Sequence, residues 1–260
     1  MRSVPGHDAQ ARSFFLAAMT HFRRLMIAAI LAGSLAGLLL FAVQHFTIIP
    51  LIDTAERFEE AAAHAGHNHA PGEHAHEDEG WQPAPGFQRV SLTALTTLLS
   101  GIGFAAVLLA AMSPRVPPRP TLLWGVLWGL AGFTCFILAP ALGLPPRPPG
   151  AVMGDLHARQ LWWTGTVLAT AAGLWVITSP GKAWWIRAAG LTILLLPHLL
   201  GAPGPNGTPD GADVIPPALL RDFLWMSLAT NLLFWLALGA LCGFLWGRQS
   251  KVRAASGPPV

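Results

Sequence analysis

A series of long apolar segments constrains the fold of this chain more than any other feature. Six such segments, each 18 to 25 residues long, follow one another between basic or proline-rich connections. About 20 apolar residues in an α-helix cross the hydrocarbon of a bilayer, and the helix satisfies its own backbone hydrogen bonds there. The sequence therefore predicts an all-α fold, a polytopic integral membrane helical bundle that forms a single transmembrane domain. The predicted spans are residues 25–46, 91–112, 121–142, 159–178, 183–200 and 222–246.

The number of spans and their orientation follow from length and charge. Six helices are expected, or five if the shortest segment, residues 183–200, does not cross. The first segment is long for a signal peptide and lacks a clear A-x-A cleavage site, so it is interpreted as an uncleaved anchor. With both termini cytoplasmic, eleven of the sixteen Lys and Arg residues lie inside, as the positive-inside rule favours. Residues 1–24 and 247–260 would then be cytoplasmic, and the loop 47–90 would be extracytoplasmic.

The outer loop contains a tract of alternating histidines and acids, HAGHNHAPGEHAHEDE, preceded by an amphipathic helix expected from Leu51 to His64. Imidazole is a suitable ligand for several divalent transition metals and is largely neutral near pH 7. Two His-x-His pairs can each offer two imidazoles to one ion, which predicts a divalent-metal collector. A flexible spacer is the alternative, and without thiolates a folded zinc finger is not expected. The candidate metal ligands are His64, His67, His69, Glu73, His74, His76, Glu77, Asp78 and Glu79.

A second set of polar residues lies within or beside the predicted spans, mostly near the outer face. Polar groups at membrane depth are costly and are functional candidates by default. For Gln44 and Asn231 the alternative is hydrogen bonding between helices, and for Asp155 it is capping of the fourth predicted helix. The candidate transport-pathway residues are Gln44, His45, Glu56, Asp155, His157, Gln160, His198 and Asn231.

Small residues spaced four apart predict where helices approach each other closely. Such pairs occur at Gly33 and Gly37, at Gly125 and Gly129, and at Gly239 and Gly243. A weak internal similarity between LATAAGLW and LATNLLFW suggests three hairpins, in which spans 1–2, 3–4 and 5–6 would pair.

Several function classes are disfavoured by the sequence. The net charge of +3 comes from bases at helix ends and does not indicate nucleic-acid binding. We find no P-loop, no H-E-x-x-H motif and no nucleophile elbow, so the chain is not expected to be an enzyme. No cofactor is expected to be required.

Stretches distributed along nearly the whole chain resemble the family of predicted cobalt transporter subunits called CbtA. They are RRLMIAAILAGSLAGLLLFAVQ, PLIDTAERFE, the His/Glu-rich loop, ALGLPPRPPG, DLHARQLWWTGTVLATAAG, LLLPHLLGAP and SLATNLLFW. The resemblance implies a multi-pass protein of the bacterial inner membrane that works with a small single-span subunit, CbtB. The family is often described with five spans, one fewer than the six predicted here.

Two functions follow from the tract, the spans and the resemblance. The first is a subunit of a divalent-metal uptake transporter, with Co2+ as the expected ion, whose outer loop collects the ion. The alternative is a membrane-anchored receptor or scaffold that delivers Co2+, Ni2+ or Zn2+ to a separate permease. Partners would be the lipid bilayer, the CbtB-like subunit, the metal ion and further copies of the chain.

Overall fold

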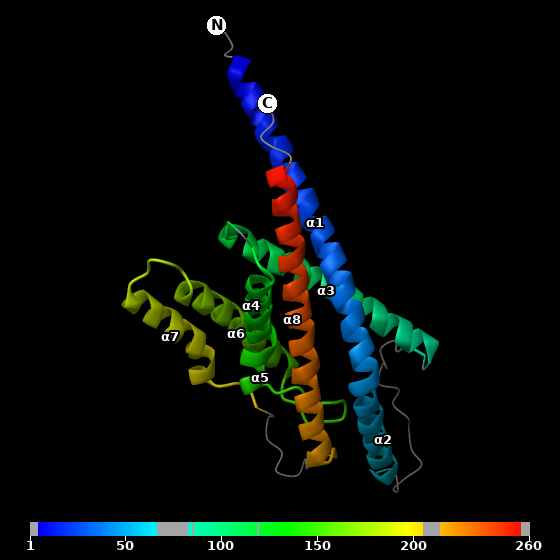
Figure 1. The fold of residues 1–260 in the computed structure, drawn as a ribbon. Coiled ribbons are helices and arrows are strands. Elements are labelled where there is room, and N and C mark those ends of the chain that lie inside the picture. The colour runs from blue at the N-terminus through cyan, green and yellow to red at the C-terminus, as the bar shows by residue number, and fades with distance from the viewer. Residues whose placement is uncertain (1–4, 67–82, 85, 119, 205–213, 256–260) are drawn as a thin grey trace.

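A computed structural model describes residues 5–66, 83–84, 86–118, 120–204 and 214–255 of the chain. These residues form helices and loops, which confirms the predicted all-α class (Figure 1). In chain order the elements are α1 (Pro5–Thr47), α2 (Ile49–Gly66), α3 (Phe87–Met112), the 3₁₀ helix η1 (Ser113–Arg115), α4 (Leu122–Phe133), the π-helical segment η2 (Thr134–Leu138), α5 (Ala139–Gly143), α6 (Leu156–Ile177), α7 (Trp184–Leu200) and α8 (Pro217–Ala255).

Four helical stretches within the described residues are long and apolar enough to cross a membrane. They are Ala18–Thr47, Phe87–Arg115, Leu122–Gly143 and Pro217–Arg248. The apolar helix α7 is shorter, at 17 residues, and α6 has 22 residues but carries His157 and Arg159 in its first turn. Helices therefore occupy all six predicted segments, and how many of them cross stays a prediction.

The two terminal helices are longer than the sequence suggested. Helix α1 begins at Pro5, 20 residues before the predicted span, and α8 extends to Ala255. Residues 7–24 contain neither proline nor glycine and include four Ala and three Arg, which favour helix. Pro5 occupies the first helical position, where its missing N–H has no intrahelical partner to lose. The apolar run therefore sets how much of each helix can lie in the membrane, but the helix itself continues beyond that run.

Glycines mediate the packing of the main helix pairs, which are α1 with α3, α4 with α8, and α6 with α7. A Cβ added at Gly37 would lie 2.7 Å from the carbonyl oxygen of Thr97, and one at Gly239 would lie 2.7 Å from Cα of Gly129. The α6–α7 contact uses Gly173 and Gly190 in the same way. The three predicted glycine pairs thus lie at close helix contacts, as expected.

The predicted pair of spans 1–2, α1 with α3, is confirmed. Spans 3 and 4 touch where η2 and α5 meet α6, but the main partner of α4 is α8, whose glycines face those of α4. The predicted pairing of spans 5–6 is wrong, because α7 packs mainly on α6, and α8 packs mainly on α4 and α1. Two helices with matching rows of small residues gain close backbone contact over several turns. The glycines of α4 and α8 provide such rows, and α8 also lies beside α1 (Figure 1).

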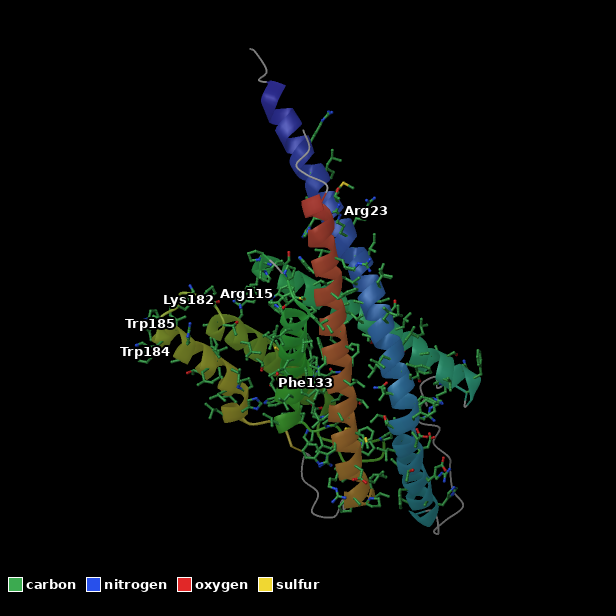
Figure 2. All side chains as sticks on the ribbon, viewed as in Figure 1. Arg23, Arg115, Phe133, Lys182, Trp184 and Trp185 are labelled. Carbon is green, nitrogen blue, oxygen red and sulfur yellow. The ribbon has the colours of Figure 1, made fainter. Side chains whose placement is uncertain are left out.

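The ends of the long helices gather at two opposite ends of the molecule. The start of α1 and the end of α8 lie together at one end, and α2 and the start of α8 lie at the other (Figure 1). Figure 2 shows Arg23, Arg115 and Lys182 in the half nearer the start of α1, with Trp184 and Trp185 beside Lys182. Both tryptophans are exposed, as expected for anchors at a membrane interface.

Candidate functional site

A cavity of about 810 Å³ lies where the end of α1 meets η2, α5, α6 and α8, at the end of the molecule opposite the start of α1. Its wall includes Gln44 near the end of α1, the loop between α5 and α6, and the first half of α8. Cavities of this size hold small molecules in many proteins. The lining residues are Gln44, Ile48, Phe136, Ile137, Pro140, Ala141, Leu144, Pro145, Pro146, Arg147, Met153, Leu156, Arg159, Gln160, Trp163, Thr164, Phe223, Ser227, Thr230 and Asn231.

A widened helical turn shapes one wall of this cavity. The segment η2 is π-helical and connects α4 to α5, which contains Pro140. Proline provides no N–H and its ring conflicts with the carbonyl four residues earlier, here that of Phe136. A π turn relieves this conflict, and such turns often occur at functional sites. Phe136, Ile137 and Pro140 all line the cavity as a result.

Three of the predicted pathway residues come together in the cavity from three different helices. Gln44 comes from α1, Gln160 from α6 and Asn231 from α8. Asn231 Nδ2 donates a hydrogen bond to the carbonyl oxygen of Ser227 at 2.9 Å, which leaves its side-chain oxygen available. In the described part of the chain, the side-chain amides of Gln44 and Gln160 make no hydrogen bond. All three amides can therefore bind a ligand.

The charge of the cavity comes from two arginines. Arg147 donates from Nη1 to the carbonyl oxygen of Val152 at 3.1 Å, and Arg159 forms no ion pair with any described residue. Among the described residues, the lining contains no Asp, Glu, His or Cys. Because a guanidinium does not lose its proton in proteins, Arg159 contributes a lasting positive charge to the described lining.

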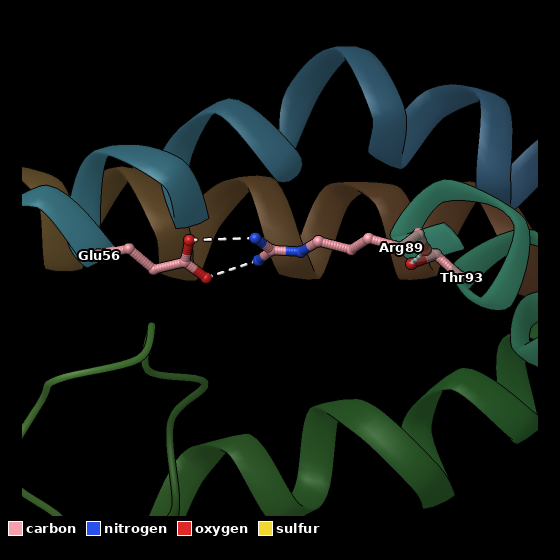
Figure 3. A network of polar contacts seen from close by, with 3 residues as sticks. All are labelled: Glu56, Arg89 and Thr93. Atoms are coloured by element: carbon pink, nitrogen blue, oxygen red, sulfur yellow. Dashed lines mark hydrogen bonds and ion pairs between the residues drawn. The ribbon is translucent and has the colours of Figure 1, made fainter. Parts of the chain in front are cut away.

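Glu56 is separate from the cavity and binds Arg89 (Figure 3). The two guanidinium nitrogens of Arg89 donate to the two carboxylate oxygens at 2.5 and 3.1 Å. This pair joins α2 to the first turn of α3, where Thr93 donates to the carbonyl oxygen of Arg89 at 2.8 Å. Both side chains are partly exposed, at 34% for Glu56 and 42% for Arg89. Glu56 is therefore neutralised while remaining accessible to water.

Asp155 and His157 lie at the start of α6 and are exposed. Asp155 Oδ1 accepts a hydrogen bond from the backbone N–H of Ala158 at 2.8 Å, which confirms the capping role considered from the sequence. Neither residue lines the cavity.

The two histidines near the spans occupy aromatic surroundings. The His45 ring lies 5.9 Å from Phe41 and 5.2 Å from Phe46, and the His198 ring lies 5.8 Å from Trp162. Nδ1 of His45 and Nε2 of His198 are buried without a hydrogen-bond partner in the described structure. Each of these nitrogens is therefore available to a ligand or to a partner subunit.

The metal-collecting tract falls largely outside the described residues. His64 is exposed near the end of α2. His67, His69, Glu73, His74, His76, Glu77, Asp78 and Glu79 lie outside the described ranges. Elsewhere, the described residues contain no group of three or more His, Cys, Asp or Glu side chains that could hold a metal. The described members of the predicted pathway set thus do not form such a group.

Arg147 was not among the residues predicted from the sequence. Its place between prolines in the loop sequence LPPRPPG was the one feature that could have indicated it. Prolines on both sides restrict the backbone, so a charged side chain there is held near the adjacent helices. Thr164, Ser227 and Thr230 were also missed, because hydroxyl residues are common in membrane helices and usually bind backbone carbonyls. Two of them do so, from Thr164 to Gln160 and from Thr230 to Met226.

These features define a multi-pass helical membrane protein with a cavity of mixed polar and apolar lining near one end of its spans. The family described as probable cobalt transporter subunit (CbtA) matches residues 22–247, and the chain belongs to this family. Its designation as a subunit implies a partner in a transporter complex. No curated protein and no solved structure matches the chain.

Proposed function

We propose that the chain takes part in uptake of Co2+ across the bacterial cytoplasmic membrane, and that its His-rich loop collects the ion on the outer face. The observation that carries this proposal is the position of α2. This helix begins one residue after Ile48, which lines the cavity, and ends one residue before His67, where the tract continues. Helix α2 thus links the collecting tract to the spans.

The exposed surface of α2 supports a collecting role. Asp53, Glu60 and His64 lie at spacings of seven and four residues, so they share one face of the helix. All three side chains are exposed, whereas Glu56 on the same face is paired with Arg89. A row of carboxylates raises the local concentration of cations. An ion released by the tract would therefore be retained near the membrane.

The membrane potential can supply energy for inward movement. A dication gains about 4.6 kcal/mol per 100 mV, twice the value for a single charge. This energy is gained over the full distance across the membrane. It does not remove the cost of dehydrating the ion, so the pathway must still provide ligands that replace its water.

The positive charge of the cavity limits how Co2+ can use it. A dication 6 Å from one guanidinium would be repelled by about 5 kcal/mol at an effective dielectric constant of 20. The amide oxygens of Gln44, Gln160 and Asn231 are too weak as ligands to offset this cost by themselves. We infer that acidic or imidazole groups of the CbtB-like subunit complete the path beside His45, Glu56, Asp155, His157 and His198.

The receptor or scaffold function is the second candidate. It is favoured by the lack of a preassembled three-ligand group among the described residues. In this alternative the tract binds Co2+, Ni2+ or Zn2+ and transfers the ion to a separate permease.

Uptake by cells without other cobalt importers tests the proposal, with the CbtB-like subunit co-expressed. Residues 64–79 would be replaced by a Gly/Ser linker of the same length, which preserves the connection between α2 and α3. We expect this variant to lose uptake at low Co2+ and to recover it at saturating Co2+, because the loop supplies local concentration.

His45→Ala and His198→Ala should lower uptake at every Co2+ concentration, since they act after collection. His21→Ala is the matched control because its ring packs against Trp246, near the other end of the spans. Normal uptake by all three histidine variants would remove His45 and His198 from the pathway. Binding of Co2+ without uptake by any version would favour the receptor.

A further inference from the structure

We propose that the cavity binds the headgroup phosphate of an anionic phospholipid at the outer membrane interface. This inference goes beyond metal uptake and does not depend on it. It follows from the charge of the cavity, its mixed lining and its position along the helices.

The charge of the lining selects an anion. Arg159 contributes a permanent positive charge, pairs with no described acid, and shares the lining with Arg147. None of the described lining residues is an acid, and of the acids beside the lining in sequence, Asp155 caps α6 and Asp222 lies 3.4 Å from Arg221. Arginine is the preferred side chain for phosphate because its planar donors match two phosphate oxygens.

Neutral donors surround the two guanidinium groups. Gln44 and Gln160 each present a free amide, and Asn231 retains one N–H beyond the one it donates to Ser227. These donors come from α1, α6 and α8, so one phosphate can accept hydrogen bonds from several elements. Such a set resembles the basic interhelical sites that bind lipid headgroups.

The apolar part of the lining distinguishes a lipid from a soluble anion. Eleven of the twenty lining residues have purely apolar side chains, and Trp163 adds an indole ring. The rim is open, with Leu156 64% exposed and Met153 48% exposed. An amphipathic ligand would place its phosphate among the polar groups and its first methylene groups along this apolar wall.

The position of the cavity agrees with a headgroup. Gln44 lies three residues before the end of α1, Arg159 is the fourth residue of α6, and Phe223 is the seventh residue of α8. Residues so close to helix ends lie near the boundary between hydrocarbon and headgroups, where lipid phosphates are found.

A bound lipid would connect parts of the fold that touch little. Helix α7 packs mainly on α6, and α6 packs on η2 and α5. A phosphate held by Arg159 and Gln160 on one side and by Gln44 on the other would tie the α6–α7 hairpin to α1. The hairpin would then be stabilised by lipid as well as by protein contacts.

Native mass spectrometry of the purified, delipidated full chain tests the proposal. Phosphatidylglycerol and phosphatidylcholine with identical acyl chains would be added separately. Phosphatidylglycerol should be retained more strongly, and Arg159→Gln should weaken its retention about fivefold, as expected for loss of one basic contact. Arg159→Lys, which preserves the charge, should retain most of the binding.

Arg221→Gln is the matched control, because it removes one positive charge near the same end without altering the cavity lining. It should bind phosphatidylglycerol as the unmodified protein does. A second measurement needs no variant: phosphatidylglycerol should raise Tm in detergent more than phosphatidylcholine does.

Three results would overturn the proposal. They are equal retention of the two lipids, equal loss in Arg159→Gln and Arg221→Gln, and displacement of phosphatidylglycerol by millimolar inorganic phosphate. The last result would identify a site for a soluble anion.

Discussion

Replacing Gly239 by alanine should separate α4 from α8. A Cβ at position 239 would lie 2.7 Å from Cα of Gly129 and would also clash with the carbonyl oxygen of Gly125. Both obstacles are backbone atoms, so no side-chain rotation can relieve them. Ordinary van der Waals contacts begin near 3.4 Å, and the two helices must therefore move apart by roughly 1 Å, which forfeits part of their dispersion energy.

The cost of this separation can be estimated. Overpacking of a well-packed contact costs about 1–3 kcal/mol, and for a chain of this size that lowers Tm by roughly 2–12 °C. Thermal unfolding in detergent, followed by tryptophan fluorescence, would measure the change. The buried Trp235 packs against this seam, and a Cβ at Gly132 would clash with its ring, so the signal reports on the affected region.

Gly165→Ala provides a matched control on α6. A Cβ there meets nothing within 4 Å, so the same chemical change should be neutral or slightly stabilising. If Gly239→Ala were as stable as Gly165→Ala, the close packing of α4 on α8 would be refuted.

Two further predictions concern the polar contacts that hold the ends of helices. Arg115 Cζ lies 3.7 Å from the centroid of the Trp175 ring, and Arg115 Nη2 donates a hydrogen bond to the backbone carbonyl oxygen of Trp175 at 2.7 Å. Arg115→Gln should therefore lower the free energy of unfolding by about 1–2 kcal/mol, as measured by thermal unfolding. Arg187→Gln, an exposed charge on α7, should cost almost nothing, and equal effects would contradict the role of Arg115. Glu56→Gln should cost less than about 1 kcal/mol because its ion pair with Arg89 is partly exposed, and added salt should shrink the difference. A larger loss of stability that does not change with salt would contradict this, because it would show that the pair is shielded from water.

The helical class and the glycine contacts were predictable because their signals are local. A run of apolar residues is visible within one helix, and so is a pair such as Gly125 and Gly129. The partner of that pair was not predictable. Gly239 lies 110 residues beyond Gly129, and several other helices also carry small residues. Which of these helices lies beside α4 depends on the whole arrangement of the bundle and not on any local pattern.

The candidate site was predictable only in part. Gln44, Gln160 and Asn231 were noticeable individually because an amide at membrane depth is costly. Their meeting in one cavity depends on the π-helical turn before Pro140, because this turn sets the positions of the lining residues Phe136 and Ile137. Arg147, the second arginine of the lining, is positioned by a loop with no repeating pattern. Neither feature has a periodic signal.

The most direct test of the central claim is Co2+ uptake into proteoliposomes that contain the purified chain and its CbtB-like subunit, with an inside-negative potential. Uptake should follow the potential, require both subunits, and fall at low Co2+ when residues 64–79 are replaced by a linker. Binding of Co2+ by the same preparation, with no accumulation at any potential, would contradict the transporter function and support a receptor that supplies another permease.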